Sequence, residues 1–315
     1  MLQRWLLFLL AAEAAVHVGV AMMLFARGWS APAIVALVLL CAFLWRLSHA
    51  LGSFVVCAAM RLLDGRRDAG MLQALVGEFT ARLLSFNIAQ PFHQWVMADE
   101  PAVGIPARAT RAATPILLVH GYFSNRGMWV RFRRRLVDNA RANIGPVYTI
   151  NLETPFDAIE TLVAQLDQRI EAICAGTGQQ QIIVIAHSMG GLVARGYLAA
   201  HGAARIAKLV TLGTPHHGTR TAAFGIGISA RQMCWNSAWL SALAKKESGR
   251  PLQPPPTASI YTVNDDMVYP PESARLDWAE NVAVHGVGHV GLLFSEAVVN
   301  RVILAIDPYV DNSKP

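Results

Sequence analysis

The sequence predicts an α/β fold, a doubly wound and mainly parallel sheet, preceded by an N-terminal hairpin of two transmembrane helices. Hydrophobic residues make up 54% of the 315 residues, above the roughly 45–50% of an ordinary soluble domain, and the excess lies within residues 1–60. From residue 115 onward, short apolar runs alternate with helical patterns. That alternation is typical of buried parallel strands with helices on both faces of the sheet.

The hairpin is predicted from two long apolar segments within residues 1–60. The first covers residues 5–26 and is interrupted only by Glu13 and His17, and the second follows the short connector at residues 27–30. Each is long enough to supply the roughly 20 residues that cross a bilayer. Glu13 and His17 lie one helical turn apart, so we expect them to pair with each other or to contact the second helix.

Basic residues predict the orientation of the hairpin. Arg4 precedes the first apolar segment, Arg61, Arg66 and Arg67 follow the second, and the connector holds only Arg27. Positive flanks stay on the cytoplasmic side, so both termini are expected in the cytoplasm, with the chain in a bacterial inner membrane. A cleavable signal peptide is the alternative for the first segment, but a second apolar run follows it directly.

Residues 61–114 are predicted to hold an amphipathic helix and a linker. Apolar residues recur at helical spacing through residues 68–97, which indicates a helix that lies on the membrane surface or packs against the next domain. Residues 98–114 are rich in Pro, Ala and Gly and read as a linker. The domain at residues 115–308 has predicted strands at residues 116–120, 147–152, 181–186, 208–213, 259–263 and 281–285.

The strongest chemical signal is Ser188, in the run Ile-Ile-Val-Ile-Ala-His-Ser-Met-Gly-Gly of residues 182–191. A buried strand leads to a serine among small residues, and a helix starts directly after it. A tight strand-to-helix turn lifts the serine oxygen above the sheet edge, where a base can activate it. Ala186 stands where the G-x-S-x-G pattern has its first glycine, and its one extra methyl group needs a slightly opened turn.

This segment resembles the α/β-hydrolase lipases and esterases, in particular bacterial lipases with A-H-S-M-G, and the resemblance covers roughly residues 115–306. It implies the α/β-hydrolase fold and an oxyanion hole made by the backbone N–H groups of Tyr122 and Met189. Residues 211–219 resemble the G-T-P-H-x-G segment of the same lipases. The expected supporting residues around the nucleophile are His120, Gly121, His187 and Gly190.

The acid and the base are expected after the nucleophile, in the order that this fold uses. Asp265 satisfies the D-x-x-V pattern of the family with Val268, and Asp266 is the alternative acid. His289 fits G-H-x-x-L in a glycine-rich loop, whereas His285 still belongs to a strand-like run. The expected catalytic residues are therefore Ser188, Asp265 and His289.

No cofactor or metal is expected. His216 and His217 are adjacent, so they point to different sides of an extended chain, and no carboxylates cluster with them in the sequence. Four cysteines suggest neither a metal spacing nor a disulfide framework, and pairing of Cys174 with Cys234 stays open. The net charge of +6 would permit nucleic-acid binding, but no recognition fold supports that. Protein partners are not indicated.

These residues favour a serine hydrolase of carboxylic esters, with a lipid or other ester as substrate and a membrane as partner. Residues 219–256 interrupt the strand–helix alternation with apolar side chains, as a cap over an acyl pocket would, or as plain core. An acyltransferase or thioesterase with the same triad is the second hypothesis. A catalytically silent membrane scaffold is the third, although a scaffold has no use for this ordered set of residues.

Overall fold

The computed structural model describes residues 2–66, 69–93, 97, 113–140, 144–154, 156–248 and 253–310. One sheet has the strand order β2-β1-β3-β4-β5-β6, and every neighbouring pair is parallel. This confirms the predicted parallel sheet. The strands are β1 Ile116–Val119, β2 Val147–Thr149, β3 Ile182–His187, β4 Ile206–Leu212, β5 Thr257–Thr262 and β6 Glu280–Val284.

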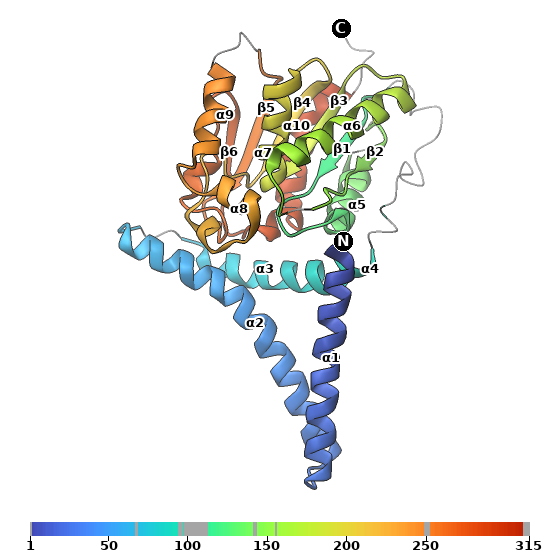
Figure 1. Cartoon of the computed structure of the whole chain (residues 1–315), viewed down its shortest axis with the longest axis vertical. Helices are drawn as coiled ribbons and strands as arrows, with labels where there is room; N and C mark the ends of the chain where they lie inside the picture. The colour runs from blue at the N-terminus through green and yellow to red at the C-terminus, as the bar shows by residue number, and fades with distance from the viewer. Residues whose placement is uncertain are drawn as a thin grey trace.

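Helices cover both faces of the sheet (Figure 1). Successive strand residues point to opposite faces, so Leu117 and Leu118 of β1 belong to two separate hydrophobic clusters. Both residues are fully buried, as the continuous apolar strands predict. The covering helices are α6 (Ile159–Thr177) and α7 (Met189–His201) on one face, and α5 (Val130–Asn139) and α10 (Glu296–Val310) on the other.

Short elements complete the domain and place its loops. Between β4 and β5 the chain forms two helices, and after His289 a 3₁₀ turn precedes α10. These elements are η2 Arg126–Trp129, η3 Arg220–Phe224, α8 Gly227–Met233, α9 Ala238–Ser248, η4 Pro271–Ala274 and η5 Val290–Leu293.

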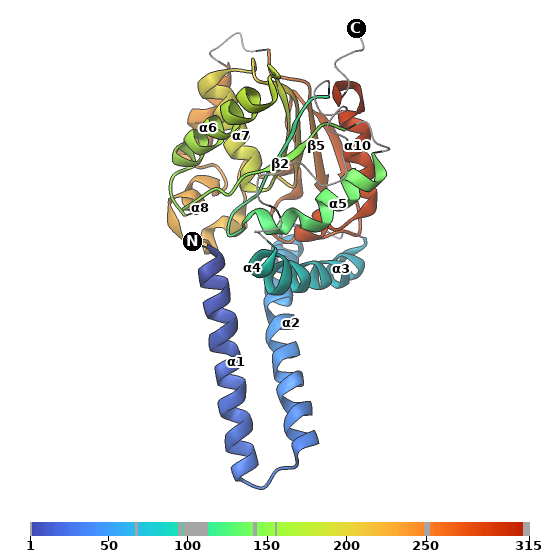
Figure 2. The ribbon, with the colours of Figure 1, turned by 90° about the vertical axis from the view of Figure 1, so that its right-hand side faces the viewer.

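The two N-terminal helices, α1 (Leu2–Ala26) and α2 (Ala31–Leu63), extend away from the sheet domain, converge, and are joined by a turn at their far end (Figure 1 and Figure 2). Both are long and apolar enough to cross a membrane, and only 6% of the most apolar window of each is buried. The core helix of a soluble protein would be mostly buried. The two helices therefore agree with the predicted hairpin.

Glu13 and His17 do not form the ion pair that their spacing permits. Arg46 of α2 reaches Glu13 of α1 with two contacts, at 2.5 and 3.1 Å, so the carboxylate links the two helices. The ring of His17 instead contacts the backbone oxygen of Glu13, at 2.8 Å. A guanidinium presents a planar fork that matches both carboxylate oxygens, and the imidazole has no such fork.

The segment after α2 crosses the base of the sheet domain, close to the point where α1 begins (Figure 1). It comprises α3 (Met71–Leu84), a π-helical turn η1 (Ser85–Ala89) and α4 (Gln90–Phe92). The amphipathic helix predicted at residues 68–97 therefore contains α3 and packs against the sheet domain. Most of the linker expected at residues 98–114 lies outside the described residues, which resume at residue 113.

Candidate active site

Ser188 occupies a strained turn between β3 and α7. Its backbone has φ 56° and ψ −127°, a conformation that a residue with a side chain rarely adopts. Its N–H donates to the carbonyl oxygen of Leu212 at 2.9 Å, which ties the turn to the end of the neighbouring strand. The turn places the serine above the carboxyl ends of the parallel strands, as the sequence pattern predicts.

Glycines allow the loop after β1 to touch this turn. A Cβ atom on Gly121 would lie 2.7 Å from the Cβ of Ser188, and one on Gly190 would lie 2.6 Å from the carbonyl oxygen of His120. Both distances are too short for a real side chain. The loop that begins at Gly121 is therefore in contact with the elbow, with Tyr122 following directly and Met189 starting the helix on the other side.

His289 and Asp265 form a buried pair. The Nδ1 of His289 lies 3.0 Å from Oδ2 of Asp265, and both side chains are almost fully buried. The other carboxylate oxygen accepts the N–H groups of Met267 and Val268 at 2.8 and 2.7 Å, so the acid is fixed in place. Gly213 leaves room for the pair, since its Cβ would lie 3.2 Å from Nδ1. His285 is exposed at the end of β6.

The pKa of His289 is raised by this environment. Burial by itself lowers it, but the charge and the hydrogen bond of Asp265 outweigh burial, and the charges of Asp266 and Glu78 act in the same direction. An imidazole that accepts a proton becomes more stable beside these carboxylates. The ring is thus suited to take a proton from a nearby hydroxyl.

Asp266, the alternative acid, has a different position. Its Oδ1 accepts the backbone N–H of His289 at 3.1 Å, whereas its other oxygen accepts the hydroxyl of Ser53 at 2.6 Å and pairs with the guanidinium of Arg82. It is fully buried. Its hydrogen bond therefore goes to the backbone at position 289, and the hydrogen bond to the imidazole comes from Asp265.

The two expected supporting histidines hold loops. His120 accepts the N–H of Leu152 on Nε2 at 2.9 Å, so its Nδ1 carries the proton and donates to the carbonyl oxygen of Gly121 at 3.0 Å. Burial lowers the pKa of His120 to about 4. His187 lies with its ring centre 4.7 Å from that of His289 and donates from Nε2 to its carbonyl oxygen. Burial lowers the pKa of His187 well below its usual value.

Ser188 and His289 line one cavity of about 500 Å³. Its size falls within the range of small-molecule sites. The walls are mostly apolar, and the first part of the insert at residues 219–256 supplies one of them. That part contributes Thr219, Thr221, Ala222, Phe224, Gly225, Ile226, Ala230 and Met233.

The described residues of the second part of the insert, 234–248 and 253–256, do not line this cavity. Trp239 donates to Glu160 of α6 at 2.7 Å, and Leu240 is buried in the cluster beneath α7. The apolar residues of the insert thus divide between pocket wall and plain core.

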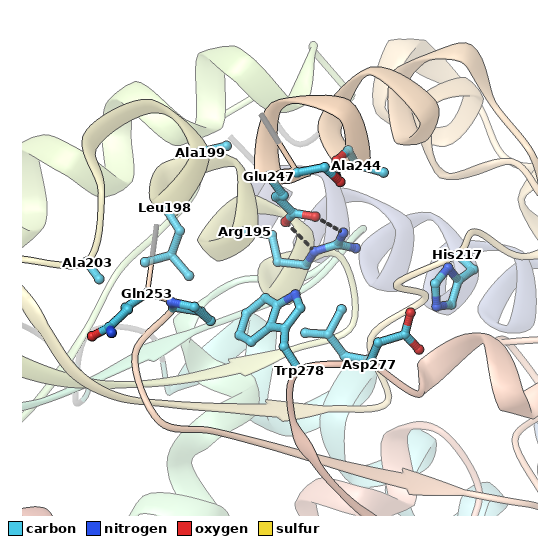
Figure 3. Close-up of a pocket in the computed structure, with 13 residues that line it drawn as sticks. Arg195, Leu198, Ala199, Ala203, His217, Ala244, Glu247, Gln253, Asp277 and Trp278 are labelled. Atoms are coloured by element: carbon cyan, nitrogen blue, oxygen red, sulfur yellow. Dashed lines mark hydrogen bonds and ion pairs between the residues drawn. The ribbon is translucent and has the colours of Figure 1, made fainter. Parts of the chain in front are cut away.

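A second cavity, of about 410 Å³, lies away from the elbow beside the C-terminal half of α7 (Figure 3). Its buried cation, Arg195, is fully engaged: it pairs with Glu247 at 2.6 Å and donates to the carbonyl oxygen of His216. His217 lines this cavity, while the ring of His216 is buried 3.1 Å from the hydroxyl of Thr211. The two histidines therefore have separate environments.

Cys174 and Cys234 are both free thiols. Cys174 is buried near the end of α6, and its Sγ faces the carbonyl oxygen of Gln180 at 3.9 Å. The Sγ of Cys234 contacts the carbonyl oxygen of Ala230 within its own helical turn. Cys174 and Cys234 therefore do not form a disulfide with each other in this structure.

Sequence reasoning missed the residues that the N-terminal helices bring to this site. Glu78 and Arg82 of α3 form an ion pair at 2.7 Å, and the carboxylate is fully buried. Breaking a buried pair by removing one partner costs about 3–5 kcal/mol, because the other charge is left uncompensated. The sequence did contain a signal for them. Glu78 and Arg82 are opposite charges at i and i+4 in an apolar helix, and the consecutive aspartates 265 and 266 call for a nearby cation.

Solved structures share this architecture. A lipase B from Aspergillus fumigatus superposes with a TM-score of 0.57 and 18% identity, over 69% of this chain and 58% of that one. A mature Bacillus licheniformis lipase gives a TM-score of 0.55 and 18% identity, over 67% of this chain and 95% of that one. The chain has the α/β-hydrolase fold. The resemblance seen in the nucleophile motif is thereby extended to the whole sheet.

Sequence comparisons point to the same superfamily. The palmitoyl protein thioesterase family model matches residues 115–249. A triacylglycerol lipase of Burkholderia plantarii is 34% identical over 41% of this chain and 37% of its own length. A triacylglycerol lipase of Pseudarthrobacter phenanthrenivorans is 34% identical over 36% of this chain and 38% of its own length. The chain thus matches less than two fifths of the length of these relatives.

Proposed function

We propose that this chain is a membrane-anchored serine hydrolase that cleaves carboxylic ester bonds of lipids. One observation carries the proposal: Ser188, on a strained elbow, faces the same apolar cavity as His289, whose ring is hydrogen-bonded to buried Asp265. A serine hydroxyl becomes a nucleophile when a base can take its proton and a third group orients that base.

The mechanism follows from these positions. His289 takes the proton of Ser188 while the serine oxygen attacks the acyl carbon, and Asp265 stabilises the imidazolium. The backbone N–H groups of Tyr122 and Met189 donate to the oxygen that becomes negative, a contribution of several kcal/mol to the barrier. The C–O bond then breaks, and the leaving alcohol receives the proton from His289. Water attacks the acyl-enzyme in the same way and releases the acid.

The surroundings of the cavity favour a lipid as the ester. Two of its wall residues are largely exposed, with 72% for Phe224 and 64% for Ile226, and Met267 is exposed by 37%. Arg82 of α3 and Phe86 of the following turn, from the segment that connects to α2, also line the cavity. Exposed apolar residues at a pocket rim mark a surface that meets an apolar partner, and a bilayer around α1 and α2 would supply one.

The membrane location rests on α1 and α2 and on their flanking charges. Both ends of the hairpin lie at the sheet domain (Figure 2), so the N-terminus and the catalytic domain share one side of the membrane. The excess of arginine outside the connector favours the cytoplasm. We therefore propose a cytoplasmic catalytic domain attached to the inner membrane of a bacterium.

A hydrolysis series over p-nitrophenyl esters of increasing acyl length tests the function, with detergent-solubilised full-length protein and a Ser188→Ala control. We expect activity that favours long acyl chains and is lost in the control. Preference for the shortest esters would contradict the lipid substrate. A fluorophosphonate probe gives a second reading: absence of an adduct on Ser188 in folded protein would leave only a silent scaffold.

Thioester hydrolysis is the second candidate, and the match of residues 115–249 to the thioesterase family model favours it. The same triad cleaves thioesters, since the tetrahedral intermediate and its oxyanion are common to both reactions. Paired substrates with one acyl chain, a glycerol ester and a cysteine thioester, separate the two. A kcat/KM for the thioester more than about tenfold higher, or 1.4 kcal/mol, would favour the thioesterase.

A further inference from the structure

The N-terminal helices hold the loops that carry the proposed acid, base and first oxyanion donor. Arg61, in the last turn of α2, donates from Nη2 to the carbonyl oxygens of Val263 and Asp265, at 2.9 and 3.1 Å. The side-chain oxygen of Gln90 in α4 accepts the N–H of Asn125 at 3.1 Å, in the loop that follows Tyr122. Two loops at the site are thus fixed from outside the sheet domain.

The third loop carries His289, and Glu78 of α3 holds it. The two carboxylate oxygens of Glu78 accept the N–H groups of Val290 and Gly291, at 3.1 and 2.7 Å. A Cβ atom on Gly288 would lie 2.5 Å from the same carboxylate. The glycine before the histidine is therefore what allows the carboxylate to approach this backbone, and Glu78 is fully buried there.

Arg82 closes the arrangement. Its Nε donates to Glu78 at 2.7 Å, and its Nη2 pairs with Asp266, which in turn accepts the N–H of His289 at 3.1 Å. The N–H groups of three consecutive residues, 289 to 291, thus end on carboxylates that one guanidinium holds together. Hydrogen bonds to a charged partner are roughly twice as strong as neutral ones.

We propose that Glu78, Arg82 and Asp266 are positioning residues that hold the base for catalysis, and that the N-terminal helices are therefore a working part of the active site. The inference rests on the proposed function, because it assigns His289 the role of base. None of the three residues needs to contact substrate for this purpose. They fix the backbone that carries the imidazole, and a shift of about 1 Å in such a group can cost about 100-fold in rate.

The same carboxylates act on the protonation of the base. The groups around the ring of His289 are Asp265, Asp266 and Glu78, which favour its cation, and neutral His187. Facing Glu78 are Arg82 of the same helix and Asp266 from the loop after β5; burial, together with Asp266, raises the pKa of Glu78 to about 7. Where Glu78 is ionised, its charge favours the cation of His289, so removal of that charge lowers the pKa of His289.

The test is Glu78→Gln in the full-length protein, because glutamine keeps the shape and one acceptor oxygen. The NH₂ group of the glutamine then faces one of the two backbone N–H groups, and two donors cannot bond to each other. The loop therefore loses one hydrogen bond, and the site loses one negative charge. We expect kcat to fall about tenfold with KM within about twofold. We also expect the acidic limb of the kcat/KM profile to move to lower pH. A residue with a merely structural role would leave that limb in place.

Two variants serve as controls. Thr80→Ala alters the same helix at an exposed hydroxyl that donates to the carbonyl oxygen of Val76 at 3.1 Å. Glu171→Gln removes a carboxylate from an exposed pair with Arg205. Both should keep the wild-type kcat and pH profile. Arg82→Lys keeps the positive charge but loses the planar guanidinium, and it should lower kcat without a large change in KM. If Glu78→Gln shows no cooperative thermal unfolding and is therefore not folded, Arg82→Lys becomes the test of the inference.

Wild-type kcat and an unmoved acidic limb in folded Glu78→Gln would overturn the inference. The failure of the proposed function has a different signature. In that case the Ser188→Ala control retains whatever activity the wild type has, and the fluorophosphonate probe labels neither protein. Equal labelling of wild type and Glu78→Gln, with equal rates, would leave the function standing and remove the positioning role.

Discussion

At the residue scale, the two consecutive aspartates divide two tasks. Asp265 turns its carboxylate to the imidazole, and Asp266 turns its own to the backbone and to Arg82. The two side chains leave the loop after β5 toward different partners, and only that of Asp265 reaches the ring. The family pattern favours Asp265, and the structure gives the reason why its neighbour is an aspartate as well.

We predict that Asp265→Asn lowers kcat by about 10³–10⁴-fold with little change in KM. Asparagine keeps the geometry, but its amide favours the wrong tautomer of the ring and offers no charge to the imidazolium. Ester hydrolysis at saturating substrate measures the effect. Asp277→Asn, at an exposed position, is the matched control, and an equal loss in both variants would contradict the assignment of the acid.

The second prediction concerns pH. The base must be neutral to accept a proton, and the carboxylate of Asp265 holds the pKa of His289 above the usual value of about 6.5. Activity should therefore rise as the pH increases through that raised pKa, and fall below it. A kcat/KM profile measured from pH 5 to 9 checks this. An acidic limb below pH 6 would show that the ring is not stabilised as a cation.

At the element scale, the insert between β4 and β5 separates into a pocket wall and a packed helix. The wall is the segment from η3 through α8, in which Phe224 and Ile226 are exposed and line the cavity that also holds Ser188. The second helix, α9, buries Leu240 and Leu243. Local sequence could not distinguish these halves, because an apolar side chain looks the same whether it meets a substrate or a core.

The third prediction tests the wall. Ile226→Ser should lower kcat/KM for long-chain esters by about tenfold, since several methyl and methylene groups are lost from an apolar site, and leave short esters nearly unchanged. Ile228→Ser is the control, because Ile228 is also exposed but does not line the cavity. Equal effects on short and long esters would argue that the acyl chain lies elsewhere.

At the scale of the whole molecule, the hairpin meets the catalytic domain through the end of α2 and through α3, which lies across the base of the sheet domain (Figure 1). The exposed rim of the cavity and the buried charges of α3 belong to the same region. An anchor joined by a flexible linker would leave the site independent of the membrane helices. Here the contacts of Arg61, Glu78 and Gln90 with the site loops join the two parts.

The fourth prediction concerns sidedness. Alkaline phosphatase fused after Pro315 should be inactive, because we propose that the catalytic domain and both termini lie in the cytoplasm. The same enzyme fused after Gly28, in the turn between α1 and α2, should be active. Alkaline phosphatase activity, measured in intact bacteria that carry each fusion, tests both expectations. The reverse result would place the domain in the periplasm.

The sequence by itself determined the sheet, the nucleophile motif and the candidates for acid and base. These are local signals: a continuous apolar strand, a serine among small residues, and a histidine in a glycine-rich loop. Each of these signals is contained within about ten consecutive residues, the range over which strand periodicity and the sterics of turns act. The strand positions expected from the apolar runs agree with the structure to within two or three residues at each end.

Only the tertiary structure decided which aspartate meets the histidine, which half of the insert lines the cavity, and that α3 supports the base. Glu78 and Gly291 are 213 positions apart along the chain. No local pattern encodes such a pairing, since it depends on how the helices dock against the sheet. A buried carboxylate becomes understandable only when the backbone N–H groups that stabilise it are in view.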